Sequence, residues 1–292
     1  YVINETVRVE EVEREEYKLG VNGTIRLKSI DAGVDYTVFI NNTEYTYKSP
    51  LPDLAKDPPD SPNTAEIILE GIAGVLPDTL TKTVLGASIE LQSEEPFTLD
   101  CKGGTTGVAI DSFQDSVGNT SKLPSTSRDG RRVKIVNTAD DRSSYFVKFI
   151  ANDSANPAGD GYWEEDLGWD EVDDTNKLAS TGLVPETMPY ILKNTAKNEF
   201  VFEPAVWENR LVGSEASNSP PSFVGKPISQ GFVYNNRLGF LSEENIILSQ
   251  SGEFTNFYFT TARTITESDP IDLNCSSIKP AKLHAVLPQT QG

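Results

Sequence analysis

Residues 231–259 read GFVYNNRLGFLSEENIILSQSGEFTNFYF, an alternation of apolar and polar side chains that polar turns interrupt. Alternation with a period of two is typical of strands with one buried face. We predict that Arg237–Phe240 continues one strand, that Ser242–Asn245 turns the chain and that Ile246–Leu248 returns. The stretch therefore predicts an antiparallel meander. Its aromatic residues Phe254, Phe257 and Phe259 predict a core or a subunit seam.

The same period of two recurs in the amino-terminal half. Residues 24–30 and 35–48 are rich in Thr, Tyr, Val and Ile, and Asn41-Asn42 lies where a hairpin turn is expected. Further strand patterns occupy residues 82–92, 96–103, 126–137, 143–153, 187–193 and 199–207. No repeat of fixed period is present.

One segment is predicted to be helical, residues 62–76. Ser61 suits the capping position and Pro62 the first helical position, while Pro77 ends the segment. One face carries its apolar residues, Ala65, Ile68, Leu69, Ile72 and Leu76. The predicted fold class is mainly β with antiparallel sheets, and its amino-terminal part is α+β with this one clear helix.

Charge and proline content suggest three regions. We predict a mainly β domain over residues 1–157, an acidic linker or loop over 158–185 and a β-meander over 186–292. Residues 151–180 carry nine acids, namely Asp153, Asp160, Glu164, Glu165, Asp166, Asp170, Glu171, Asp173 and Asp174. A basic cluster of Arg128, Arg131, Arg132 and Lys134 is interpreted as a solvated or salt-bridged strand face.

The chain has 25 basic and 44 acidic residues, a net charge of −19. Such a surface repels phosphate, so specific nucleic-acid binding is not expected. No apolar run approaches the roughly 20 residues of a membrane-spanning helix. A single histidine, His284, and two distant cysteines, Cys101 and Cys275, offer no metal or nucleophile motif. We expect no cofactor and no metal.

Carboxylate chemistry leaves little local signature, so a glycan or peptidoglycan hydrolase stays open as an alternative. Its candidate residues are Glu164, Glu165 and Asp166, beside Tyr162, Trp163 and Trp169. The same residues would suit a carbohydrate-binding module. A hydrated acidic loop anchored by the tryptophans is the interpretation we favour. The loop lacks the regular ligand spacing of a calcium site.

The second half, about residues 185–287, resembles the tail nozzle proteins (tail tubular protein B) of short-tailed bacteriophages. The stretches 187–193, 202–228 and 235–273 carry the resemblance in the family's order. The first 180 residues resemble that family loosely. The motif residues are Thr187, Met188, Pro189, Trp207, Arg210, Phe223, Gly225, Arg237, Gly239, Phe240, Ser249, Phe254, Phe257, Asp269, Pro270 and Asp272.

The resemblance implies a non-enzymatic virion protein of the phage tail, present in the host cytoplasm during assembly. It implies a homo-oligomer, in the family a sixfold ring, that forms a tube for DNA ejection. It also implies docking on a tail adaptor protein and on fibre or spike proteins, and a meander that begins a β-propeller. We then expect the chain to be a fragment whose further blades follow. Acidic side chains facing the lumen would let DNA pass without specific binding.

Overall fold

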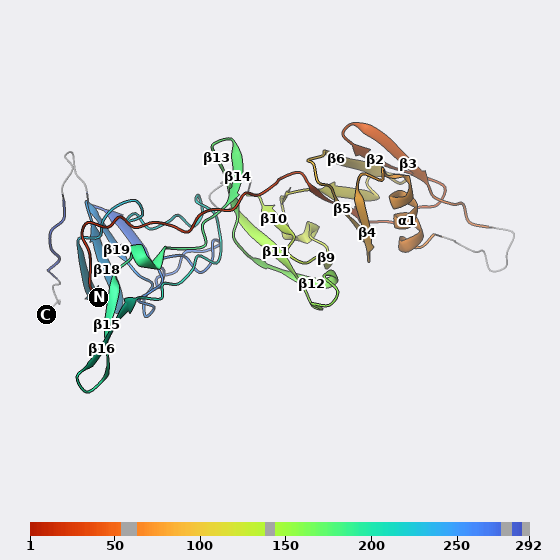
Figure 1. Ribbon diagram of the computed structural model, residues 1–292. Coiled ribbons are helices and arrows are strands. Elements are labelled where there is room, and N and C mark those ends of the chain that lie inside the picture. Colours follow the sequence, from red (N-terminus) through yellow and green to blue (C-terminus); the bar gives the residue numbers. More distant parts are fainter. Residues whose placement is uncertain (54–62, 138–143, 276–281, 288–292) are drawn as a thin grey trace. The chain divides into compact units, whose positions relative to one another are not determined.

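The computed structural model describes residues 1–53, 63–137, 144–275 and 282–287 (Figure 1). The chain forms two compact units. Unit 1 combines Tyr1–Glu16 with Leu167–Gly292, and unit 2 is Tyr17–Asp166. This division differs from the three predicted ranges, because the first sixteen residues fold with the carboxy-terminal part.

The first sheet of unit 2 has four antiparallel strands. In spatial order they are β4 (Thr81–Leu85), β5 (Ser88–Gln92), β1 (Asn22–Leu27) and β7 (Ile110–Phe113). Ile25 of β1 and Ile89 of β5 are paired and fully buried. The predicted strands over residues 24–30 and 82–92 are therefore confirmed in kind, with shifted ends.

A second sheet of unit 2 pairs β3 (Thr43–Lys48), β2 (Asp35–Ile40) and β6 (Leu99–Gly103) in that order. The predicted turn at Asn41-Asn42 is confirmed, since both residues have positive φ angles, 49° and 62°. Two left-handed residues in a two-residue loop match the right-handed twist of the strands.

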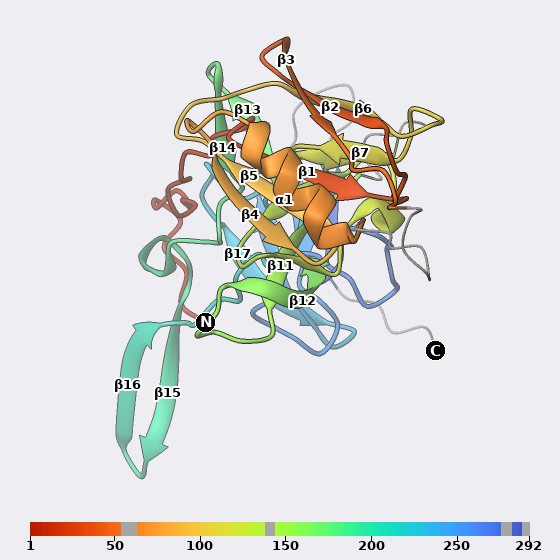
Figure 2. The same ribbon diagram turned by 90° about the vertical axis from the view of Figure 1, so that its right-hand side faces the viewer.

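Helix α1 (Ala65–Val75) packs on β3, β4 and β5, and Figure 2 shows it lying over the sheet. Four of its residues, Ile68, Leu69, Ile72 and Ala73, enter the core of unit 2. The side chain of Thr64 caps the helix by accepting a hydrogen bond from the Ile67 amide at 3.2 Å. The predicted cap Ser61 and first residue Pro62 lie outside the described residues.

The third sheet of unit 2 has five strands. Their order is β8 (Ser116–Val117), β10 (Arg132–Ile135), β11 (Tyr145–Ala151), β12 (Ala158–Glu165) and β9 (Thr126–Arg128). Its core consists of Phe113, Val117, Val133, Ile135 and Val147. The basic cluster was predicted to be a solvated or salt-bridged strand face, and two of its residues are salt-bridged. Arg131, only 3% exposed, lies 3.8 Å from Asp115, and Arg132 pairs with Asp166 at 2.6 Å.

Unit 1 contains two hairpins and a four-stranded sheet. The hairpins are β13 (Trp169–Val172) with β14 (Thr175–Leu178) and β15 (Tyr190–Ala196) with β16 (Glu199–Pro204). The part of the chain predicted to be an acidic linker thus contains strands.

The four-stranded sheet follows the predicted antiparallel meander. Its order is β17 (Gln230–Tyr234), β18 (Arg237–Ser242), β19 (Asn245–Leu248) and β20 (Ile271–Asn274). All six residues of β18 are buried. Phe257 and Tyr258 are buried in the core, whereas Phe254 is 39% exposed, so a subunit seam stays the prediction for Phe254.

The amino-terminal segment crosses unit 1 in extended form, without a full strand. Isolated antiparallel bridges join Arg8 to Pro227 and Glu11 to Leu183, and Val9 is 1% exposed within the core. The segment is therefore partly buried. Among the described residues, no helix has both the length and the apolar character to cross a membrane.

Candidate assembly site

An aromatic cluster forms the centre of unit 1. It consists of Trp207, Phe223, Phe240 and Phe257, with ring centroids 5.4 to 6.0 Å apart. Phe240 lies on β18, and the other three rings come from loops. Edge-to-face and stacked pairs at these distances stabilise a core beyond their area alone. The motifs at residues 207, 223, 240 and 257 thus meet at one place.

Arg237 joins two loops to the start of β18. Its Nη1 donates to the carbonyls of Ser249 at 2.7 Å and Asp269 at 2.6 Å, and its Nη2 donates to the carbonyl of Glu267 at 2.6 Å. The Ser249 hydroxyl accepts from the Leu238 amide at 3.0 Å. One buried guanidinium therefore fixes the positions of three backbone segments.

Two further motif residues hold loops at the sheet edge. Asp272 on β20 accepts hydrogen bonds from the amide and the hydroxyl of Ser222, at 2.7 and 2.6 Å. Gly225 has a φ of +78°, which favours glycine, and its amide donates to the Val9 carbonyl at 2.8 Å. The loop of residues 222–226 thereby binds both β20 and the amino-terminal segment.

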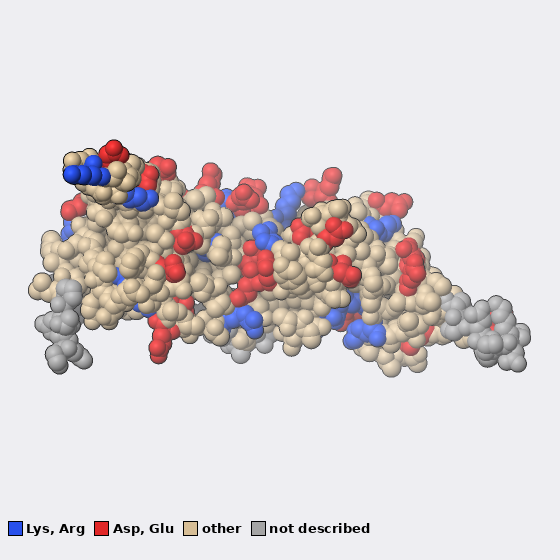
Figure 3. All heavy atoms as spheres, turned by 90° about the horizontal axis from the view of Figure 1, so that it is seen from below, with Lys and Arg blue, Asp and Glu red and all other residues tan. Residues whose placement is uncertain are grey.

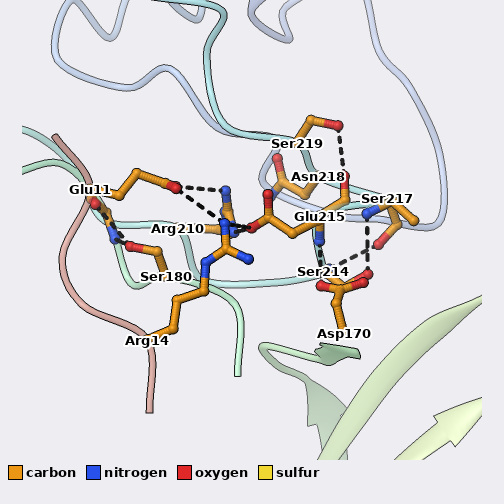
Figure 4. Close-up of polar contacts among 12 residues, drawn as sticks. Glu11, Arg14, Asp170, Ser180, Arg210, Ser214, Glu215, Ser217, Asn218 and Ser219 are labelled. Carbon is orange, nitrogen blue, oxygen red and sulfur yellow. Dashed lines mark hydrogen bonds and ion pairs between the residues drawn. The ribbon is translucent and has the colours of Figure 1, made fainter. Parts of the chain in front are cut away.

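Arg210 lies at the centre of an ionic network (Figure 4). Its fully buried guanidinium contacts Glu11 at 3.2 Å and Glu215 at 2.8 Å, and it lies over the Tyr258 ring, 4.9 Å from the centroid. The Glu215 amide in turn donates to the Asp170 carboxylate at 2.8 Å. The network ties the amino-terminal segment to residues nearly two hundred positions away.

Burial governs the electrostatics of this network. It raises the pKa of Glu11, although Arg210 favours the charged carboxylate, and it raises the pKa of the Tyr258 phenol. A paired and buried charge of this kind is costly to break, because the remaining partner is left without compensation. The geometry is that of a structural clamp, and no bound group is needed to explain it.

Most of the motif residues are buried inside unit 1. Met188, Pro189, Gly239 and Asp269 are buried with the aromatic cluster and the two arginines, whereas Gly225, Phe254 and Asp272 are exposed. Thr187 and Pro270 are intermediate, and the Thr187 hydroxyl accepts from the Glu10 amide at 3.0 Å. A buried side chain offers a neighbouring copy no direct contact. The role of these residues in assembly stays a prediction.

The residues of the hydrolase alternative are divided between the two units, with residues 162–166 in unit 2 and Trp169 in unit 1. Trp163 belongs to unit 2, where its ring packs on Phe149 and its Nε1 donates to the Pro124 carbonyl at 2.8 Å. Trp169 belongs to unit 1 and is 9% exposed. Asp166 is paired with Arg132 and Lys148. Each tryptophan is thus held in packing, and Asp166 is held in ion pairs.

Among the residues that the structure describes, no group of three His, Cys, Asp or Glu residues is placed to hold a metal ion.

An exposed surface that the sequence patterns did not reveal lies on the β15–β16 hairpin. Figure 2 shows this hairpin projecting away from the rest of unit 1. Three of its apolar side chains, Leu192, Phe200 and Phe202, are 57, 61 and 57% exposed. The period of two predicts the strands, but it does not tell which alternating face is covered.

Comparison with known proteins agrees with the resemblance found in the second half. The model of the bacteriophage nozzle protein family matches residues 1–292. The chain belongs to the bacteriophage nozzle protein family. The match extends to the amino-terminal half, where the sequence resemblance was loose.

A relative of this nozzle protein chain is the tail tubular protein gp12 of Escherichia phage T7. The two are 29% identical over 279 residues, which cover 93% of this chain and 33% of the relative. The chain thus spans about a third of the length of the relative. Membership of the nozzle family supports a structural role in the phage tail.

Proposed function

We propose that the chain is part of a subunit that assembles into a ring and forms the tubular nozzle of a phage tail, through which DNA leaves the particle. The match of the nozzle family over residues 1–292 carries this proposal. The subunit docks on a tail adaptor protein and on fibre or spike proteins. It resides in the virion tail after assembly in the host cytoplasm.

The architecture supports a scaffold role. The buried arginines and the aromatic cluster of unit 1 are engaged in packing and hydrogen bonds with the chain itself. Rigid loops held in this way suit a protein that bears load and does not open around a substrate.

The sheet β17-β18-β19-β20 supports the proposal that unit 1 contains part of a β-propeller. Four antiparallel strands in meander order are the usual content of one propeller blade. We infer that this sheet is the first blade. Exposed apolar residues on its outer strands, Val233 on β17 and Leu273 on β20, are then the sites where adjoining blades pack.

Conduction of DNA through such a tube benefits from an acidic wall. A surplus of acids repels the phosphate backbone and prevents adhesion to the wall. On the face drawn in Figure 3, acidic side chains lie among basic and uncharged ones. On this face the acidic side chains are therefore spread among other residues and do not gather in one patch.

The test is the rate of DNA ejection from phage particles that carry charge-reversed subunits. Sets of exposed acids in each unit are replaced by lysine, beginning with Glu13 and Glu15 in unit 1 and with Glu94 and Glu95 in unit 2. We expect at least one set to slow ejection, because lysine attracts phosphate. Glutamine at the same positions controls for loss of the acid alone. Ejection at the wild-type rate from every lysine set would contradict an acidic lumen.

A further inference from the structure

The β15–β16 hairpin has one apolar and one charged face. Cross-strand pairing places Leu192 opposite Phe202 and Asn194 opposite Phe200, so these side chains share a face. The other face carries the ion pair of Lys193 with Glu203, at 2.7 Å. The hairpin is amphipathic, and both of its faces are exposed, so its apolar side chains are left uncovered.

The apolar face continues into a cavity at the base of the hairpin. Tyr190 and Phe202, whose rings stack at 5.0 Å, line the cavity and belong to the apolar face. The cavity measures about 410 Å³, and its other walls include Val2, Ile3, Met188 and Ile228. The backbone of Val2 exchanges two hydrogen bonds with that of Tyr190, at 2.7 and 3.0 Å. The apolar face of the hairpin and the cavity, which Glu186 also lines, therefore form one continuous surface within unit 1.

Charge favours a second copy of the chain as the occupant of this surface. Two copies of net charge −19 repel one another over most of their surfaces. The apolar face of the hairpin carries no charged side chain, because alternation places Glu199 and Glu203 on the other face. In addition, Lys197 lies at the hairpin tip and Glu186 lines the cavity. The tip of one copy and the cavity of another thus carry opposite charges.

We propose that the apolar face of the β15–β16 hairpin packs against a second copy of this chain, with the tip of one hairpin at the cavity of the next copy. The seven residues of β15 span about 24 Å at the usual rise per strand residue, enough to reach across such a seam. A contact between two different surfaces is heterologous, which a ring of more than two copies requires. The proposal rests on the proposed function, since it names the surface by which the ring closes.

Two neighbouring substitutions on β16 test the proposal in the full-length protein. Phe200→Glu places a charge on the apolar face, and Val201→Glu places the same charge on the opposite face, where Val201 is 41% exposed. Native mass spectrometry over a concentration series measures assembly. We expect Phe200→Glu to weaken assembly at least tenfold and Val201→Glu to leave it unchanged, because burying an unpaired carboxylate is costly. Equal assembly of Phe200→Glu and wild type would overturn the proposal.

A photocrosslinker identifies the occupant directly. Benzoylphenylalanine replaces Phe200 in one preparation and Val201 in the other, and both are irradiated in assembled particles. We expect Phe200 to give covalent dimers of this chain, linked to residues near Met188 and Ile228, and Val201 to give none. Links from Phe200 to a different tail protein alone would overturn the hairpin proposal and leave the proposed function standing. A wild-type protein that stays monomeric and is absent from the tail would contradict both.

Discussion

Two buried arginines, Arg210 and Arg237, hold together segments of unit 1 that lie far apart in sequence. Arg210 pairs with Glu11 and Glu215, whereas Arg237 binds backbone carbonyls alone. The planar guanidinium presents donors in several fixed directions at once, which the single ammonium of lysine cannot match. Each position therefore requires arginine for its geometry as well as for its charge.

Arg237→Lys is expected to lower the free energy of unfolding of unit 1 by about 2–4 kcal/mol, because at least one buried carbonyl loses its donor. Urea denaturation measures the loss. Arg8→Lys is the matched control, since exposed Arg8 binds one carbonyl, that of Gly225 at 2.7 Å, and should cost less than about 1 kcal/mol. An Arg237→Lys midpoint equal to that of wild type would show that the three bonds contribute nothing.

In unit 2 the most informative residue is Glu90, a carboxyl that is 7% exposed. Burial raises its pKa, and the nearby Arg131 and a hydrogen bond from Thr24 at 2.9 Å oppose the rise only in part. The folded state then binds a proton at a pH where the unfolded state has lost it. The contribution of Glu90 to the free energy of unfolding is therefore fully present below the ordinary pKa of glutamate. It is lost as the pH rises through the raised pKa of the folded state.

Glu90→Gln removes this dependence of stability on pH. The free energy of unfolding of the wild type, relative to that of the variant, should therefore fall between pH 5 and pH 8. The fall is about 1.4 kcal/mol for each unit by which folding raises the pKa. Denaturant unfolding at both pH values measures it, with the exposed Glu94→Gln as control. A difference that stays constant or grows with pH would mean that the carboxyl is not penalised by burial.

At the scale of elements, α1 contains two glycines with opposite environments. A Cβ on Gly71 would overlap the ring of Tyr47 on β3, whereas a Cβ on Gly74 would meet nothing. The helix therefore passes close to β3 at Gly71. Gly74 faces solvent, where glycine only weakens the helix.

Gly71→Ala should destabilise unit 2 by about 1–3 kcal/mol through overpacking, and Gly74→Ala should stabilise it by up to about 1 kcal/mol. Because both variants carry the same substitution in the same helix, Gly74→Ala is the control for Gly71→Ala. Thermal unfolding measures both. Equal shifts of the melting temperature for the two variants would contradict the close approach of α1 and β3.

Local patterns predicted the elements that depend on neighbouring residues. The turn at Asn41-Asn42, the apolar face of α1 and the meander of β17–β19 each follow from spacing over a few positions. Thr64 is the capping residue of α1, because its side chain accepts the hydrogen bond of the Ile67 amide at the start of the helix. Capping residues of similar chemistry occur within a few positions, so sequence alone left the start unresolved.

Contacts between distant residues were not predictable. The pairing of Glu11 with Arg210, 199 positions away, depends on the fold of the whole unit. The exposed hairpin was missed for a related reason, since alternation in β15 and β16 looks the same whether the apolar face is covered or bare. Phe254 was predicted to lie in a core or a subunit seam, and its side chain is 39% exposed within unit 1.

At the scale of the whole molecule, two compact units carry one family signature. The nozzle family model extends over residues 1–292, through unit 2 as well as unit 1. In the proposed ring, the strong negative charge repels DNA from the wall, and the uncharged face of the β15–β16 hairpin packs against the next copy. The central claim is that the protein is a building block of the phage tail.

Gold-labelled antibody against this chain, applied to purified phage particles, tests that claim most directly. The account predicts label confined to the tail, in particles seen by electron microscopy, and a band of the protein in the washed particles. Particles that are infectious yet carry neither label nor band would contradict the account.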